Sequence, residues 1–209
     1  YMYPNVMQIP VRKDSGIKTF ADFKGKGFAV GASGSATELN SRDMAKVFGL
    51  DYMTKKDFKP EYASEAQSVE LIKNRQADGA NLIAGIGAAS VMDLMSSDKF
   101  ELLSISDEKL AELNKMNPAY FKYVIPANTY PNQPKPVQTF AVANYIFARK
   151  DLPEDMVYKF TKALYENQAD LVAAHKAAKE MTKESAVNGL TVPRPPGAAK
   201  YLKEIGAIQ

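Results

Sequence analysis

The sequence predicts an α/β fold in which a mostly parallel sheet is covered by helices. Short apolar runs such as Phe28-Ala29-Val30 alternate with amphipathic segments of about ten residues or more. Strands separated by helices of that length are typical of βαβ units, because parallel neighbours need a crossover connection. The chain has 209 residues, 45% of them hydrophobic, which is enough for one large domain or two small ones.

The pattern assigns a residue range to each expected element. After the apolar run Val6–Val11 we expect one or two helical turns at 17–23. Expected strands then cover 27–30, 58–63, 82–84, 100–105 and 120–125, and expected helices cover 35–48, 64–75, 88–95 and 107–116. Pro126–Pro136 holds four of the twelve prolines and interrupts the alternation. A strand at 139–149, a helix from Asp151 with Pro153 in its first turn, and a short helix at 198–205 follow.

The junction after the expected strand at 27–30 is the most informative segment for function. Gly31-Ala32-Ser33-Gly34 allows a sharp turn, and Ser35 with Glu38 has the spacing of a capping box. The helix that follows has its expected inner face at Ala36, Leu39, Met44, Val47 and Phe48. Because the first N–H groups of a helix are unpaired and its dipole is positive there, this junction favours a carboxylate or a phosphate.

Turn geometry and helix capping would explain the same residues without any ligand. Loops with built-in chemistry fit poorly, since the Walker A ending Gly-Lys-Ser/Thr and the spacing G-x-G-x-x-G are both missing. Ser33 fails the last position of G-x-S-x-G, and a serine hydrolase using Ser33 and His175 would also need an acidic partner. We therefore expect a site that binds without catalysis.

Composition narrows the partners further. The 27 basic and 24 acidic residues give a net charge of +3 without a basic cluster, which argues against nucleic acid. The chain has no cysteine and one histidine, so we expect no disulfide, no metal site and no cofactor. No stretch approaches the roughly 20 apolar residues of a membrane span, so we expect no direct membrane insertion. The chain opens at Tyr1 inside what reads as folded sequence, which suggests that a preceding segment, such as a signal peptide, was removed or left out.

Several segments together resemble one family of receptors. VRKDSGIKTFADFKGKGFAVGASGS is similar to a strand, helix and strand–loop–helix unit shared by type II periplasmic solute-binding proteins. More specific similarity, to the TAXI family of solute receptors for TRAP transporters, extends over essentially the whole chain. It is carried by GSATELN, VIPANTYPNQ, DLPEDMVYKFTKALYEN, AAHKAAKEM and PPGAAKYLKEIG.

The resemblance implies a type II fold with two α/β lobes, mostly parallel sheets and crossing hinge strands. Residues 1–10 would form the end of lobe 1 and the outward hinge, 11–143 lobe 2, and 144–209 the return hinge and the C-terminal part of lobe 1. Members normally carry an opening section of about a hundred residues, the size of a small lobe. That section is missing from this sequence, so lobe 1 is expected to be incomplete.

The resemblance also implies a function. The chain would be an extracytoplasmic receptor, periplasmic or tethered to the membrane of a Gram-positive cell, that serves a sodium-coupled TRAP transporter. Its ligand would be a small carboxylate or amino acid of the glutamate, glutamine or dicarboxylate class, bound between the lobes. A ligand-sensing domain of the same fold, fused to DNA-binding helices, is the alternative.

Matched onto this sequence, the family's anion site in lobe 2 falls on Ser33, Gly34, Ser35 and Thr37. The hydroxyls of Ser33 and Thr37 would donate to the ligand, and the amides of Ser35 and Ala36 would complete the site. The alternative is that Ser35 only caps the helix and Thr37 faces solvent.

Two further ligand contacts are expected. Gly85-Ile86 follows the strand at 82–84 and so lies at the carboxyl end of the sheet, where open α/β sheets bind ligands. Tyr130 is the best aromatic candidate, able to cover the apolar stem of a ligand and to donate its hydroxyl. The alternative for Tyr130 is a packing role in a proline-stiffened loop.

Overall fold

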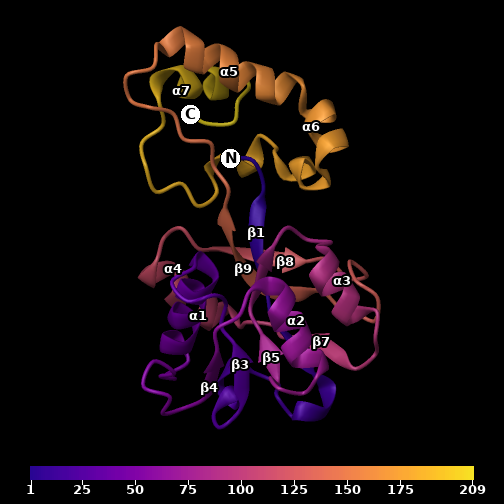
Figure 1. Cartoon of the computed structure of the whole chain (residues 1–209). Helices are drawn as coiled ribbons and strands as arrows, with labels where there is room; N and C mark the ends of the chain where they lie inside the picture. The colour runs from indigo at the N-terminus through magenta and orange to yellow at the C-terminus, as the bar shows by residue number, and fades with distance from the viewer. The chain divides into compact units, whose positions relative to one another are not determined.

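The computed structural model describes residues 1–209, which divide into two compact units (Figure 1). Unit 1 comprises Tyr1–Asn5 and Val142–Gln209, and unit 2 comprises Val6–Ala141. The chain therefore passes from unit 1 into unit 2 and returns. None of the helices combines the length and the hydropathy that crossing a bilayer requires.

Unit 2 is built on two sheets, and two of their strands, β1 and β9, continue along the chain into unit 1. The four-stranded sheet has the order β6-β1-β9-β8, from β1 (Pro4–Gln8), β6 (Leu82–Ala84), β8 (Phe121–Ile125) and β9 (Val137–Ala143). The five-stranded sheet has the order β4-β3-β5-β2-β7, from β2 (Pro10–Arg12), β3 (Gly27–Ala29), β4 (Lys59–Glu61), β5 (Gly79–Ala80) and β7 (Phe100–Leu102).

The prediction of mostly parallel sheets is wrong. Only β3–β4 and β3–β5 pair in parallel, whereas β2–β5, β2–β7, β1–β6 and β8–β9 are antiparallel. The alternation of strands and helices correctly indicates that β3 and β4 run the same way. It cannot show that β2, which precedes the alternation, is inserted between β5 and β7 and runs against both.

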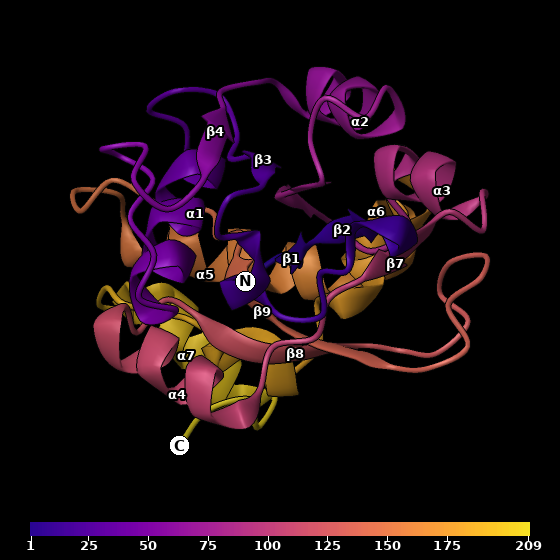
Figure 2. The same ribbon diagram turned by 90° about the horizontal axis from the view of Figure 1, so that it is seen from below.

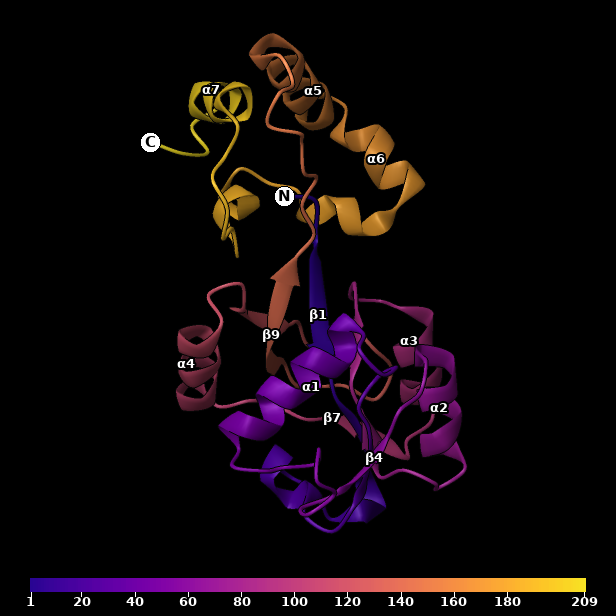
Figure 3. The same ribbon diagram turned by 60° about the vertical axis from the view of Figure 1, so that its left-hand side comes forward.

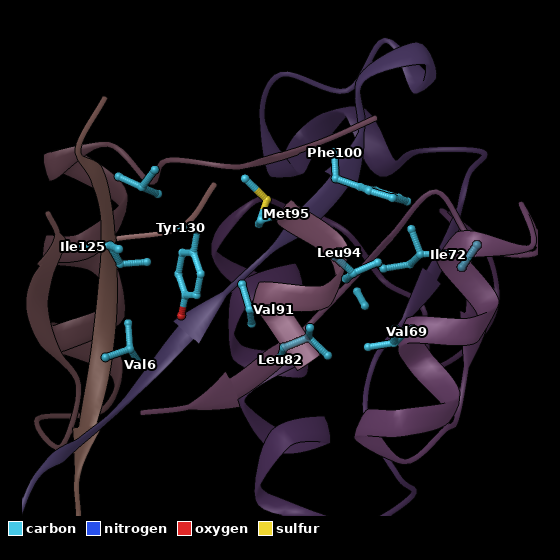
Figure 4. Packing of buried hydrophobic residues seen from close by; sticks show 14 of the residues in the cluster. Val6, Val69, Ile72, Leu82, Val91, Leu94, Met95, Phe100, Ile125 and Tyr130 are labelled. Carbon is cyan, nitrogen blue, oxygen red and sulfur yellow. The ribbon is translucent and has the colours of Figure 1, made fainter. Parts of the chain in front are cut away.

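The helices of unit 2 lie close to their expected positions. They are α1 (Ala36–Val47), α2 (Glu65–Lys73), α3 (Ala89–Met95) and α4 (Asp107–Met116), with 3-10 turns η1 (Lys13–Ser15) and η2 (Phe20–Phe23). Figure 2 shows α4 alongside β8, and Figure 3 shows α2 beside α3, in agreement with the contacts between these elements. Val69 and Ile72 of α2 meet Leu94 of α3 in the main core cluster (Figure 4).

The expected inner face of α1 needs correction. Ala36 is exposed and Leu39 is 51% exposed, whereas Glu38 and Ser41 are fully buried with Met44. The polar pair is buried because each side chain has partners. Glu38 accepts hydrogen bonds from Arg42 and Tyr52, and the Ser41 hydroxyl donates to the Val30 carbonyl at 2.8 Å.

Unit 1 is helical apart from the ends of β1 and β9. Its helices are α5 (Glu154–Glu166), α6 (Gln168–Ala174) and α7 (Pro196–Glu204), with 3-10 turns η3 (Lys176–Glu180) and η4 (Glu184–Val187). The backbones of α7 and α5 approach each other closely at Gly197, where an added Cβ would clash with the Glu154 carbonyl oxygen. The strand expected at 139–149 ends at Ala143, and Asp151 pairs with Arg149 while α5 begins at Glu154.

Unit 1 also leaves a large apolar surface open. Phe147 is 73% exposed, and Met156 and Phe160 of α5 are 55% and 50% exposed. A pocket of about 330 Å³ opens beside them and is lined mainly by aromatic and aliphatic side chains, among them Phe160 and Tyr165. In α5 only Val157 is buried, although the helix is strongly amphipathic.

Candidate functional site

Two helices of unit 2 begin at the same edge of the five-stranded sheet. β3 leads into α1 and β4 leads into α2, and β3 and β4 are parallel neighbours in register from Gly27 with Lys59 to Ala29 with Glu61. The carboxyl ends of the two strands therefore meet at one edge, and each helix starts there. The third parallel strand, β5, ends at the same edge, because Ala80 pairs with Ala29. Open α/β sheets bind ligands at such an edge.

Gly31 determines how the loop after β3 folds against α1. Its φ is +102°, and a Cβ there would lie 2.8 Å from both Cβ and Cγ2 of Thr37 and 2.9 Å from the Glu38 nitrogen. The loop is also tied to the neighbouring strand, because the Ala63 N–H donates to the Gly31 carbonyl at 3.3 Å. Only glycine allows this close approach of the loop to the first turn of α1.

A pocket of about 130 Å³ lies at this edge. Its lining comes from the loop after β3, the first turns of α1 and α2, and the residues that follow β5, and comprises Gly31, Ala32, Ser35, Thr37, Ala63, Ser64, Glu65, Ser68, Asn81, Leu82 and Ile83. Apart from Glu65 these groups are neutral, and several carry hydroxyls or backbone N–H groups. The pocket therefore offers hydrogen-bond donors to an anion without a cationic side chain.

Helix α1 presents unpaired donors at this pocket. Ser35 caps the helix by accepting from the Glu38 N–H at 3.2 Å. The N–H groups of Ala36 and Thr37, at the first two helical positions, have no intrahelical acceptor, as in any α-helix. These donors and the positive end of the helix dipole can hold one carboxylate.

The capping box predicted for α1 is only half formed. The Glu38 carboxylate does not reach back to Ser35 but is buried, where it accepts from Arg42 Nε and, at 2.8 Å, from the Tyr52 hydroxyl. Burial alone would raise the pKa of Glu38, but the hydrogen bonds from Arg42 and Tyr52 outweigh it, and the pKa lies below its usual value. Burial, together with the Glu38 carboxylate, raises the pKa of Tyr52 far above its usual value. The charge of Glu38 is thus compensated by Arg42.

Helix α2, which follows β4, has its own N-terminal cap. Ser64 accepts from the Gln67 N–H at 3.4 Å, and the Gln67 side chain accepts from the Ser64 N–H at 2.9 Å, which completes a capping box. Glu65 lies in the first turn of α2 and accepts a hydrogen bond from the Ser90 hydroxyl. Ser68 is buried and donates to the Ser64 carbonyl at 2.9 Å.

The structure brings together some of the residues expected in the site and leaves others apart. Ser35 and Thr37 line the pocket, while Ser33, Gly34 and Ala36 are exposed beside it and contribute no lining side chain. Gly85 and Ile86 lie in the turn between β6 and α3 and do not line it, and Ile86 packs against the core cluster.

Tyr130 is buried, and its hydroxyl has two hydrogen-bond partners. It is 3% exposed, so its ring packs inside unit 2 (Figure 4). Its hydroxyl donates to Gln8 Oε1 and accepts from the Gly87 N–H at 2.8 Å. Burial raises the pKa of this hydroxyl, which keeps it protonated as a donor. Tyr130 therefore fixes the turn that contains Gly85 and Ile86 to strand β1.

Sequence reasoning missed Ser64, Ser68 and Asn81, all of which line the pocket. Two signals could have identified Ser64 and Asn81, whereas no sequence signal marks Ser68. Ser64 and Gln67 have capping-box spacing directly after an expected strand. Asn81 is a polar residue in the apolar run Gly79–Ala84, where the chain leaves β5 in one sheet for β6 in the other.

The single histidine does not line the pocket. No group of three or more His, Asp or Glu side chains is arranged to hold a metal ion. His175 lies in unit 1, where its ring stacks on Tyr3 with centroids 5.3 Å apart and its Nδ1 accepts from the Ala177 N–H at 3.3 Å. The imidazole is therefore engaged locally, and Ser33 in unit 2 has no histidine in its own unit.

The chain matches one protein family and is similar to several solved structures. A model described as the NMT1-like family matches residues 1–206. The periplasmic aliphatic sulphonate binding protein SsuA from Escherichia coli is 20% identical, with a TM-score of 0.48 over 96% of this chain and 55% of that one. A mutant of ArgBP from T. maritima is 18% identical, with a TM-score of 0.36 over 55% of this chain and 51% of that one.

A third solved structure is the second substrate binding domain of a putative amino acid ABC transporter from Streptococcus pneumoniae. It is 15% identical, with a TM-score of 0.40 over 86% of this chain and 59% of that one. The chain thus spans between 51% and 59% of the lengths of these three proteins.

Proposed function

The chain belongs to the NMT1-like family, and from this premise we propose that it is the ligand-binding part of an extracytoplasmic solute receptor. Its ligand is a small carboxylate or amino acid, of the glutamate, glutamine or dicarboxylate class. The receptor is of the TAXI type, is periplasmic or tethered outside the cytoplasmic membrane, and delivers its ligand to the membrane subunits of a sodium-coupled TRAP transporter. It binds its ligand without chemical change.

One observation carries the proposal. The first turns of α1 and α2 meet around a pocket of about 130 Å³, at the carboxyl edge of parallel strands. Ser35 and Ser64 line the pocket with their hydroxyls, and the first turn of α1 beside it carries the unpaired N–H groups of Ala36 and Thr37, which suit a carboxylate. Ser33 and Gly34 lie exposed at the same loop, and we assign them to the rim of the site.

Gly85 and Ile86 remain part of the proposal as a second contact region, because their turn follows β6 and is held by the Tyr130 hydroxyl through Gly87. We assign Tyr130 a positioning role in that turn instead of direct contact, since its ring is buried. The ligand-sensing domain of the same fold is the second candidate function, and the same pocket would serve it. The two differ in what the protein is fused to or works with, not in the ligand.

Isothermal titration calorimetry with L-glutamate, L-glutamine, succinate and L-malate tests the proposal. We expect at least one of the four to bind the wild-type chain with a single site. Ser35→Asp keeps a residue that caps helices well but places a carboxylate among the donors of the pocket. Like-charge contact costs several kcal/mol, so the affinity of this variant should fall by about 100-fold or more.

Ser106→Asp is the matched control. Ser106 also caps a helix of unit 2, α4, by accepting from the Lys109 N–H at 3.4 Å, but it does not line the pocket. The substitution adds the same charge and should leave the affinity unchanged. Equal affinity in the wild type and Ser35→Asp would refute the site, and no binding of any of the four solutes would refute the proposed ligand class.

A further inference from the structure

The pocket contains a buried hydrogen-bond acceptor without a partner. Only two buried side-chain polar atoms in the structure have no hydrogen-bond partner, and they are Glu38 Oε2 and Asn81 Oδ1. The other oxygen of the Glu38 carboxylate, Oε1, already accepts hydrogen bonds from Arg42 and Tyr52. Asn81 is 1% exposed, lines the pocket, and has no donor on its carbonyl oxygen. Such an atom is unusual, because most buried polar groups are hydrogen-bonded.

The orientation of the Asn81 amide follows from its neighbours. One amide atom lies 3.0 Å from the Thr37 carbonyl oxygen, which can only accept, so that atom is the nitrogen Nδ2. Nδ2 also donates to the Ser41 hydroxyl at 2.8 Å, and this hydroxyl donates onward to the Val30 carbonyl. The oxygen Oδ1 therefore lies on the side of the amide group that faces away from these partners of α1.

We propose that Asn81 Oδ1 accepts a hydrogen bond from the bound solute, so that the pocket selects carboxylates with a donor group on the adjacent carbon. This inference rests on the proposed function, because it assumes that the first turn of α1 holds the carboxylate of the solute. The donor is an ammonium or a hydroxyl group, and both would satisfy the oxygen.

The size and charge of the pocket support a donor close to the carboxylate. A volume of about 130 Å³ is close to that of a cavity that binds one benzene, so the carboxylate and the donor that reach it belong to one end of a small solute. Asn81 is tied by its own Nδ2 to Thr37 in the first turn of α1, which puts the acceptor next to the carboxylate donors. Glu65, the one ionisable side chain in the lining, favours an ammonium over a hydroxyl.

Matched solutes test the inference on the wild-type chain. Each set keeps one carbon skeleton and changes only the group on the carbon next to the carboxylate: L-glutamate, L-2-hydroxyglutarate and glutarate, and likewise L-alanine, L-lactate and propionate. Leaving a buried acceptor unpaired should weaken the plain acid by about 10- to 100-fold relative to its amino or hydroxy counterpart. The amino acid should bind at least as well as the hydroxy acid.

Asn81→Ala removes the acceptor and should bring the affinities of the hydroxy acid and the plain acid of a set to within about threefold of one another, while Glu65 still favours the amino acid. Asn114→Ala is the control, because Asn114 also donates from Nδ2 to a backbone carbonyl, that of Tyr120, but lies on α4 and not in the pocket. It should keep the wild-type preference. Thermal unfolding of both variants checks that they are folded, and the wild-type series alone still decides the inference if Asn81→Ala is not.

The outcomes separate the inference from the function on which it rests. Plain acids that bind as tightly as their amino and hydroxy counterparts would overturn the role of Asn81 and leave the receptor function standing. A preference for the hydroxy acid over the plain acid that persists in folded Asn81→Ala would also overturn it. Binding of no member of either set would overturn the carboxylate site, and with it both proposals.

Discussion

Gly31→Ala should be the most damaging single substitution in the loop that forms the pocket. The residue has φ +102°, a backbone conformation that side chains rarely adopt. Its new Cβ would meet Cβ and Cγ2 of Thr37 at 2.8 Å and the Glu38 nitrogen at 2.9 Å. Rotation of the threonine side chain would move Cγ2, but Thr37 Cβ and the Glu38 nitrogen are fixed by the first turn of α1 and cannot move without the helix.

The expected cost has two parts. An alanine held in a sparsely populated backbone region costs about 1–3 kcal/mol. Inserting a methyl group where the backbone already lies in contact costs a further ~1–3 kcal/mol. Gly34→Ala is a matched comparison three residues away, because Gly34 has φ +73° but nothing lies within 4 Å of the added Cβ. It should cost only the strain of a left-handed conformation, about 1–2 kcal/mol.

Urea unfolding followed by far-ultraviolet circular dichroism measures the difference. With a slope of about 1–3 kcal/mol per molar urea, an extra 2 kcal/mol lowers the midpoint of the Gly31→Ala variant by roughly 1 M relative to Gly34→Ala. Binding of the solute should also weaken more in Gly31→Ala, since its clash displaces the turn that holds Thr37. Equal midpoints for the two variants would refute the claim that close packing of the loop on α1 requires glycine.

Three further outcomes follow from the structure. Tyr130→Phe should lower the free energy of unfolding by about 1–3 kcal/mol, because it leaves Gln8 Oε1 without its buried donor, and an unchanged urea midpoint would contradict this. Burial raises the pKa of Glu38, but the hydrogen bonds from Arg42 and Tyr52 lower it further, so the folded-state pKa lies below the usual value. The ionised carboxylate therefore stabilises the fold above the unfolded-state pKa of about 4.3. That contribution is lost as pH falls through the lower folded pKa, so unfolding midpoints measured from pH 6 to pH 2 should decline more steeply for the wild type than for Glu38→Gln. The open apolar surface of unit 1 should bind the dye ANS in the native state, and Phe147→Asp, at a position 73% exposed, should reduce its fluorescence without changing the circular dichroism spectrum.

The sequence predicted the order of the elements in unit 2 well, because periodicity and caps are local signals. The expected helix at 107–116 coincides with α4, and Ser35 and Ser64 cap the helices whose starts they were expected to mark. The direction of β2 was not predictable, because its partners β5 and β7 are chosen by tertiary pairing after the chain has crossed between sheets. The open face of α5 could not be seen in its pattern either, since amphipathic periodicity predicts a buried face whether or not anything covers it.

The sequence pointed to only part of the lining of the pocket. The strand–loop–helix signal led to Ser35 and Thr37, which line the pocket. The start of α2 and Asn81 lie roughly thirty and forty-five residues after Ser35 in the sequence. Only the pairing of β3 with β4 and β5 brings these segments to the start of α1. For Tyr130 the sequence left ligand contact and a packing role open, and the burial of its ring and the hydrogen bond from its hydroxyl to Gln8 favour packing.

The most direct test of the central claim is to follow backbone amide resonances by NMR while a solute that binds in calorimetry is titrated into the wild-type chain. The claim is that the first turn of α1 holds the carboxylate, so the Ala36 and Thr37 amide signals should shift saturably, with the same dissociation constant as the calorimetric one. Amides at the start of α4, such as Asp107, should not move. Saturable shifts confined to other segments, with Ala36 and Thr37 unmoved, would contradict the account.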